Sequence, residues 1–132
     1  MRVLLDLHTF LWWVSGSDEL SPTAKDVLET RTNEIFFSTI SSFELAVLVS
    51  TQRKPPTTLK ADEIEAFISE QLRINEFHLL RLDLNHSCRV GLLPFHHRDP
   101  WDRILVAQAQ IENLVMLTHD EKIRAYDVQT LW

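Results

Sequence analysis

The fold of this chain is decided by the stretch Asp99-Pro100-Trp101-Asp102-Arg103-Ile104-Leu105-Val106-Ala107-Gln108-Ala109. An aspartate, then a proline, then a second acid two positions later are typical of an N-cap, a first helical residue and a third helical residue. The apolar residues that follow extend this helix to about Glu112, and the run Leu114-Val115-Met116-Leu117 predicts a buried strand directly behind it. We therefore expect helices and strands to alternate.

The same alternation runs through the rest of the chain. Short apolar runs predict three more strands that are covered on both faces, at residues 2–5, 35–37 and 77–82. Further helices are predicted at residues 8–14, 22–30, 41–51, 64–72 and 85–90. Residues 53–58, with two prolines and two threonines, are predicted to be a loop. The pattern predicts an α/β sandwich around a mostly parallel sheet, with right-handed crossovers.

Length and composition bound the class of protein. The chain has 132 residues, of which 45% are hydrophobic, so one domain spanning residues 1–132 can bury a core without disulfides or structural zinc. The single cysteine, Cys88, excludes a disulfide framework and indicates a reducing compartment, most simply the cytoplasm. The first apolar run ends at Asp6, so neither a signal peptide nor a membrane span is expected there.

Charge and glycine content narrow the function. The net charge is −6, with 13 lysines and arginines against 19 acids, which argues against binding nucleic acid by bulk charge alone. Gly16 and Gly91 are the only two glycines, so neither a P-loop nor a dinucleotide-binding fingerprint is present. A nucleic-acid substrate would therefore need metal ions and a local basic rim.

Four acids follow strands or begin helices in the predicted layout: Asp6, Glu44, Asp102 and Asp120. The carboxyl ends of parallel strands share one edge of a sheet, so we expect these carboxylates to converge. Converging carboxylates repel one another unless a cation is present, and hard oxygen ligands suit Mg²⁺ or Mn²⁺. Such a site can acidify a water, hold a phosphate and stabilise a leaving oxygen, as in metal-dependent phosphoryl transfer.

Each acid also has a purely structural interpretation. Asp6 and Asp120 could cap the segments that follow them. Glu44 lies three residues after Ser41, the spacing of a capping box. Asp102 would favour the helix dipole whether or not it binds a metal. The prediction of a metal site therefore depends on the four acids lying together.

Basic and aromatic residues are the candidates for contacts with a substrate. Phosphate-contacting candidates near the pocket are His97, Arg98 and Arg103, with a solvated loop as the alternative. Arg53 and Lys54 could likewise touch RNA or solvate a helix end. Adjacent histidines and the lack of a second cysteine argue against zinc. Four tryptophans could stack on bases, but aromatic residues beside apolar neighbours are more often core or dimer contacts, so no site role is assigned to them: Trp12, Trp13, Trp101 and Trp132.

With these residues in place, the sequence resembles the PIN-domain ribonucleases of the VapC-like toxin type. The resemblance runs the length of the chain, and residues 99–109 are its most specific part. The other matching segments are Val3-Leu4-Leu5-Asp6 with Leu11-Trp12, Ser41-Ser42-Phe43-Glu44-Leu45-Ala46, Thr118-His119-Asp120 and Leu131-Trp132.

The resemblance implies a PIN-like three-layer sandwich, in which a mostly parallel sheet of four to five strands lies between helices. It implies that Asp6, Glu44, Asp102 and Asp120 hold one or two Mg²⁺ or Mn²⁺ ions, in an endoribonuclease whose metal-activated water cleaves RNA. We interpret Asp99 as an N-cap first and an auxiliary ligand second, and the resemblance adds Thr118 as an auxiliary hydroxyl. The implied partners are an antitoxin protein and a second copy of the chain, as a homodimer.

One departure and two alternatives accompany this resemblance. Leu7 follows Asp6 where the family usually carries a small hydroxyl residue, and Thr9 is the nearest hydroxyl. The alternative is a non-catalytic α/β module that binds Mg²⁺, either a phospho-acceptor receiver or an inactive PIN-like interaction domain. A receiver is expected to carry paired acids after its first strand, whereas Leu5 precedes Asp6 here.

Overall fold

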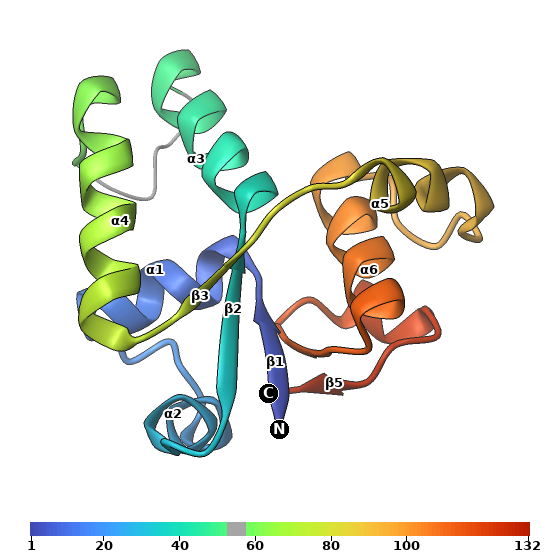
Figure 1. Cartoon of the computed structure of the whole chain (residues 1–132), viewed down its shortest axis with the longest axis horizontal. Helices are drawn as coiled ribbons and strands as arrows, with labels where there is room; N and C mark the ends of the chain where they lie inside the picture. Colours follow the sequence, from blue (N-terminus) through green and yellow to red (C-terminus); the bar gives the residue numbers. More distant parts are fainter. Residues whose placement is uncertain (53–57) are drawn as a thin grey trace.

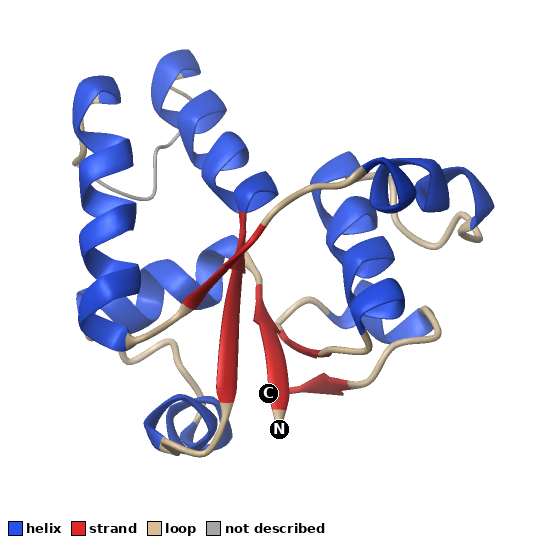
Figure 2. Cartoon of the chain, in the orientation of Figure 1, coloured by secondary structure: helices blue, strands red, loops and turns tan. Residues whose placement is uncertain are grey.

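A computed structural model describes residues 1–52 and 58–132 of the chain. Its centre is a parallel sheet in the order β3-β2-β1-β4-β5 (Figures 1 and 2). The strands are β1 (Arg2–Leu5), β2 (Glu34–Ser38), β3 (His78–Leu80), β4 (Val115–Leu117) and β5 (Thr130–Leu131). The predicted α/β class with a parallel sheet between helices is confirmed. Most of the predicted loop, together with Arg53 and Lys54, lies outside the described residues.

Helices fill the connections between these strands. They are α1 (Leu7–Ser15), α2 (Pro22–Glu29), α3 (Thr39–Thr51), α4 (Ile64–Asn75), α5 (Leu84–Arg89) and α6 (Pro100–Glu112). Three short 3₁₀ helices add to them: η1 (Ala61–Glu63), η2 (Val90–Leu92) and η3 (Glu121–Ala125). The predicted starts of α2 and α6 are confirmed, because Ser21 and Asp99 are N-caps and each is followed by a proline. None of the helices in the described ranges has the length and hydropathy to cross a membrane.

The predicted start of α3 was wrong. Strand β2 continues to Ser38, whose hydroxyl accepts a hydrogen bond from the Ile40 amide at 3.0 Å and caps the helix three residues earlier than expected. Ser41 is consequently a buried residue inside α3, and Glu44 lies in the second turn of that helix. The capping-box interpretation of Glu44 is therefore removed, which leaves this carboxylate without a capping role.

The centre of the sheet is buried on both faces because residues of β1 alternate between two cores, whereas the edge strand β3 is largely exposed. Val3 and Leu5 point into a core formed with α1, α2, α3 and α4, where the Phe10 and Phe37 ring centroids lie 4.3 Å apart. Leu4, which is fully buried, points to the opposite face and packs in a core with α6. In Figure 1, α1, α2 and α4 lie to one side of the strands, and α5 and α6 lie to the other.

Candidate metal centre

The register of the sheet sets up the site. Leu5 on β1 is paired with Phe37 on β2 and with Leu117 on β4. The next residue of each strand path therefore reaches the same carboxyl edge: Asp6, Ser38 and Thr118. Helix α1 begins directly after Asp6 and α3 directly after Ser38, so side chains early in both helices also lie at this edge.

Asp6 is held in place by its neighbours. It is 7% exposed, and its Oδ1 accepts a hydrogen bond from the Thr9 amide at 2.7 Å, as the N-cap of α1. Its Oδ2 accepts a short hydrogen bond from the Thr118 hydroxyl. Thr118 Oγ1 also accepts the Asp120 amide at 3.1 Å, so one hydroxyl links the first and last acids of the set.

The departure at Leu7 has a local explanation. Leu7 is 1% exposed and packs in the core with α1 and β1, so an apolar residue suits this position. The hydroxyl of Thr9 donates to the Leu117 carbonyl oxygen at 3.1 Å, which ties α1 to β4. Thr118, from β4, supplies the hydroxyl contact to Asp6 instead.

Two carboxyl groups have strongly raised pKa values. Burial, reinforced by Asp102 and then by Asp99 and Asp6, raises the pKa of Glu44 from 4.5 to about 7. Burial and the charge of Asp99 raise the pKa of Asp102 from 3.8 to about 7, with His97 acting in the opposite direction. The charges of Asp6 and Asp99 act on both Glu44 and Asp102, so these four acids lie near one another at the carboxyl edge of the sheet.

His97 joins this cluster between two carboxylates. Its Nε2 lies 2.7 Å from Asp120 Oδ2 and 3.0 Å from Asp102 Oδ2. Its Nδ1 accepts the Asp99 amide at 3.0 Å, which assigns a neutral ring with the proton on Nε2. His97 therefore donates a hydrogen bond to Asp120, and the same nitrogen lies close to Asp102.

That tautomer bears on which atoms could hold a metal. His97 Nε2, Asp102 and Asp120 offer ligand atoms that all lie within 4.8 Å of one another. A metal on Nε2 would need that nitrogen deprotonated and Nδ1 protonated, which would break the bond from the Asp99 amide. We therefore assign His97 to positioning the carboxylates.

Asp120 and Asp99 are each tied to the start of a helix. Burial tends to raise the pKa of Asp120, but the hydrogen bonds from His97 and from the Lys122 amide outweigh it, so the pKa lies below its usual value. Asp99 Oδ1 accepts the Trp101 amide at 2.9 Å, as the predicted N-cap. Asp102, one turn into α6, faces His97, whereas the Asp99 carboxylate caps the helix.

The predicted basic rim separates into two kinds of residue. Arg98 is exposed and makes no ion pair within the described ranges. Arg103 is 8% exposed, and its guanidinium donates to the carbonyl oxygens of Val90, Leu93 and Pro94 and to the Tyr126 hydroxyl. Both terminal nitrogens of the guanidinium therefore donate to the protein, whereas the sequence suggested a contact with phosphate.

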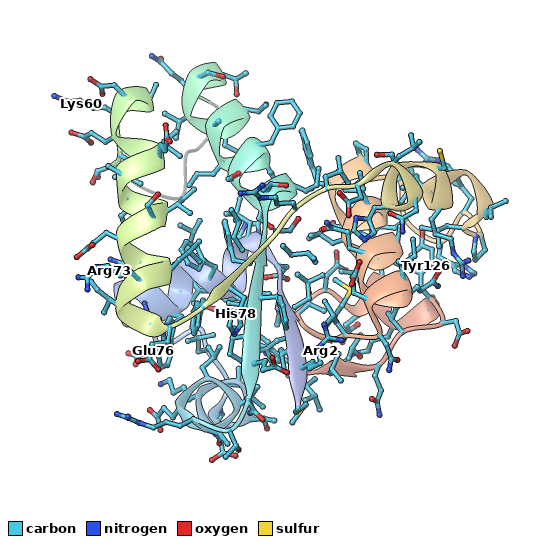
Figure 3. The ribbon with its side chains drawn as sticks, viewed as in Figure 1. Arg2, Lys60, Arg73, Glu76, His78 and Tyr126 are labelled. Atoms are coloured by element: carbon cyan, nitrogen blue, oxygen red, sulfur yellow. The ribbon has the colours of Figure 1, made fainter. Side chains whose placement is uncertain are left out.

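Tyr126 connects this buried arginine to the centre. Its hydroxyl lies 3.1 Å from Arg103 Nη1 and accepts the His97 amide at 2.9 Å, beside α6 (Figure 3). Tyr126 thus links the segment that carries His97 to Arg103 of α6. Sequence reasoning missed Tyr126 and the positioning role of His97, because neither follows a strand or begins a helix.

A divalent cation fits the donor set. The cluster offers carboxylate oxygens from Asp6, Glu44, Asp102 and Asp120, which are the hard ligands that Mg²⁺ and Mn²⁺ prefer. Burial first and the neighbouring acids second raise the pKa values of Glu44 and Asp102, and among the described residues neither carboxylate is paired with a lysine or arginine. The arrangement can hold a divalent ion at the carboxyl edge of the sheet.

Comparisons with known proteins identify relatives along the whole chain. A family model described as the PIN domain matches residues 3–129. Ribonuclease VapC22 of Mycobacterium tuberculosis is 27% identical over 135 residues, which cover 94% of this chain and 91% of the relative. VapBC2 from Rickettsia felis, solved with a promoter DNA fragment, has a TM-score of 0.72 at 16% identity and covers 99% of this chain and 98% of its own. A toxin–antitoxin complex from Klebsiella pneumoniae has a TM-score of 0.64 at 20% identity, with 98% and 96% covered.

Proposed function

The chain belongs to the PIN domain family, and from that membership and the acidic cluster we propose that it is a metal-dependent endoribonuclease that acts as the toxin of a toxin–antitoxin pair. The relative with 27% identity over 94% of this chain is a ribonuclease by name. The observation that carries the proposal is the pair of carboxyl groups, Glu44 and Asp102, whose pKa values are raised to about 7 at the carboxyl edge of the sheet. Carboxyl groups with pKa values perturbed this far are typical of functional sites, and a metal-dependent nuclease centre requires such a set of acids.

The ligands of the metal would be Asp6, Glu44, Asp102 and Asp120, with Asp99 and Thr118 as auxiliary groups. When bound, Mg²⁺ or Mn²⁺ supplies positive charge that attracts the RNA phosphate and favours deprotonation of an attacking water. Thr118 keeps Asp6 oriented through its hydroxyl. His97 keeps Asp102 and Asp120 together through Nε2.

Substrate phosphates need cations besides the metal. Arg98, exposed next to His97, is free to contact the RNA backbone. His97 and Arg103, also expected at this rim, are engaged with the protein, and we propose that they act by shaping the segment that presents Arg98.

The decisive experiment is cleavage of a structured RNA by the purified chain with Mn²⁺, with Mg²⁺ and with EDTA. The variants Asp6→Asn and Asp102→Asn remove one ligand charge each with little change of shape, and Asp62→Asn on η1 is the matched surface control. We expect the parent and the control to cleave the RNA with Mn²⁺ or Mg²⁺ and not with EDTA. Cleavage that survives EDTA and both ligand substitutions would overturn the metal mechanism.

Partner binding has separate support. The similar Klebsiella pneumoniae structure is a toxin–antitoxin complex. In this chain, a groove of about 450 Å³ between α3 and α4 has mostly apolar walls, which suits an apolar segment of a protein such as an antitoxin. For the proposed homodimer, Leu84, Leu92 and Phe95 are 80%, 77% and 74% exposed and offer apolar area to a second copy, which light scattering of the purified chain would test.

The two alternative functions are a receiver-like module and an inactive PIN-like interaction domain. Membership of the PIN domain family replaces the receiver-like module. An inactive PIN-like interaction domain predicts no cleavage under any metal condition, so the same experiment separates it from the proposed nuclease. The free, exposed thiol of Cys88 suits the proposed cytoplasmic location.

A further inference from the structure

A cavity of about 460 Å³ opens beside the metal centre. Two of the centre's acids contribute to its wall, and aromatic and acidic residues complete it: Asp6, His8, Trp12, His119, Asp120 and Glu121. The cavity lies within the size range of small-ligand sites and is too small for a duplex. Any group bound in it would lie next to the carboxylates.

The aromatic side chains of this cavity contact one another in tilted and edge-to-face arrangements. Trp12 is surrounded at centroid distances of 5.8 Å by His8, 6.1 Å by His119 and 5.7 Å by Trp132, with interplanar angles of 50°, 79° and 55°. His119 and Trp132 also meet edge to face at 5.3 Å. Because no pair in this group is parallel, none of these rings is stacked face to face on another.

The polar atoms of these rings are also unused. Within the described ranges, the side chains of His8, Trp12 and His119 have no hydrogen-bond partner, whereas the neighbouring Trp13 indole donates to Asn75 at 2.8 Å. An aromatic face with free ring nitrogens matches a nucleobase, which presents a π-face and an edge of donors and acceptors. Stacking also needs no positive charge. It is therefore compatible with an acidic centre, where positive charge is lacking.

Chain connectivity fixes the cavity relative to the acids. His8 and Trp12 lie one turn apart on α1, which starts directly after Asp6. His119 immediately precedes Asp120. The cavity and the metal ligands therefore share the same chain segments, and a base held here would set the position of an adjacent phosphate over the metal centre.

We propose that this cavity binds one unpaired nucleobase of the RNA, stacked on His119 and hydrogen-bonded by the ring nitrogens of His8 and Trp12. This assignment rests on the proposed ribonuclease function and gives Trp12 a base-binding role, where its sequence context favours a core or dimer contact. It implies a single-stranded or flipped-out substrate, because a paired base cannot enter.

The test measures binding in an Asp102→Asn background, with 5′-fluorescein-labelled rA8, rC8 and rU8 and an abasic ribose-phosphate octamer, by fluorescence anisotropy. We expect at least one base-carrying octamer to bind about 5- to 150-fold more tightly than the abasic octamer, the range that stacking of one base corresponds to. His119→Ala and Trp12→Leu should remove most of that preference and leave abasic binding unchanged. His78→Ala, which changes an exposed histidine that lies against Phe36 (Figure 3), is the matched control and should bind as the parent does.

The outcomes separate this proposal from the proposed function. Unchanged base preference in His119→Ala, with circular dichroism confirming its fold, would overturn the cavity assignment even if the parent chain cleaves RNA. His119→Ala carries this decision because its exposed side chain can be removed without opening the core, whereas Trp12 also packs against that core. Loss of base preference in a chain that shows no cleavage would support the cavity and refute the nuclease.

Discussion

Replacing Glu44 by glutamine should stabilise the metal-free protein at neutral and alkaline pH. Its pKa is raised from 4.5 to about 7, so the folded chain binds this proton more tightly than the unfolded chain does. The contribution of Glu44 to stability is therefore fully present below its unfolded pKa and is lost as pH rises through the folded value. Glutamine keeps the shape and cannot ionise, so the variant escapes this loss.

The magnitude follows from the shift. One pKa unit corresponds to about 1.4 kcal/mol, so the full shift would correspond to about 3 kcal/mol. Glu44 is only partly buried, and solvent screening reduces this figure to about 1–2 kcal/mol. For a chain of this length we expect the melting temperature of Glu44→Gln to exceed that of the parent by about 3–8 °C at pH 8.

The assay is urea or thermal unfolding in EDTA from pH 4.5 to pH 8, repeated with Mn²⁺. The difference between Glu44→Gln and the parent should develop between pH 4.5 and about 7, and Mn²⁺ should stabilise the parent more than the variant. Glu65→Gln, an exposed acid in the first turn of α4, should stay within about 0.5 kcal/mol of the parent. A Glu44→Gln gain that is absent at pH 8, or equal at both ends of the range, would refute the reasoning.

Three further outcomes are expected. Mn²⁺ binding at pH 7 should release about one proton, because Glu44 and Asp102 titrate near that pH, and calorimetry in buffers of different ionisation enthalpy should show it; identical heats in all buffers would contradict it. Arg98→Gln should lower the salt dependence of RNA binding by about one phosphate contact without changing the melting temperature. Arg103→Met should lower the free energy of unfolding by about 2–4 kcal/mol, because it strands three backbone carbonyls and the Tyr126 hydroxyl; a change below about 0.5 kcal/mol would show that these bonds contribute little.

Most of the fold could be predicted because local signals agreed with tertiary packing. The buried apolar strands and the serine–proline and aspartate–proline helix starts appear where the sequence places them. The start of α3 was mispredicted because two serines competed, and sheet pairing decided between them. Ser38 pairs with Leu80, which extends β2 to the residue that caps the helix. The spacing of residues within one segment does not show how that segment pairs with a distant strand.

The site was predictable in its acids and not in its supports. The acids follow from the rule that parallel strands end at one edge. The contacts of His97 and Tyr126 depend on how the segment between α5 and α6 folds over the centre, and no periodic pattern describes that segment. The sequence suggests Arg103 as a cation at the rim of the pocket because it gives the position of this residue in the helix and does not give its burial. Trp12 shows the same limit, since an apolar context cannot distinguish a core ring from a cavity wall.

The acids differ in how fully the chain already satisfies them. Asp6, Asp99 and Asp120 each accept a backbone amide, and Asp6 and Asp120 accept a side-chain donor as well. Among the described residues, Glu44 accepts no hydrogen bond and Asp102 contacts only His97, and these are the two groups whose pKa values rise to about 7. The satisfied acids are already held in place by these hydrogen bonds. A cation would therefore act chiefly on Glu44 and Asp102, which makes them the residues through which metal, pH and stability are coupled.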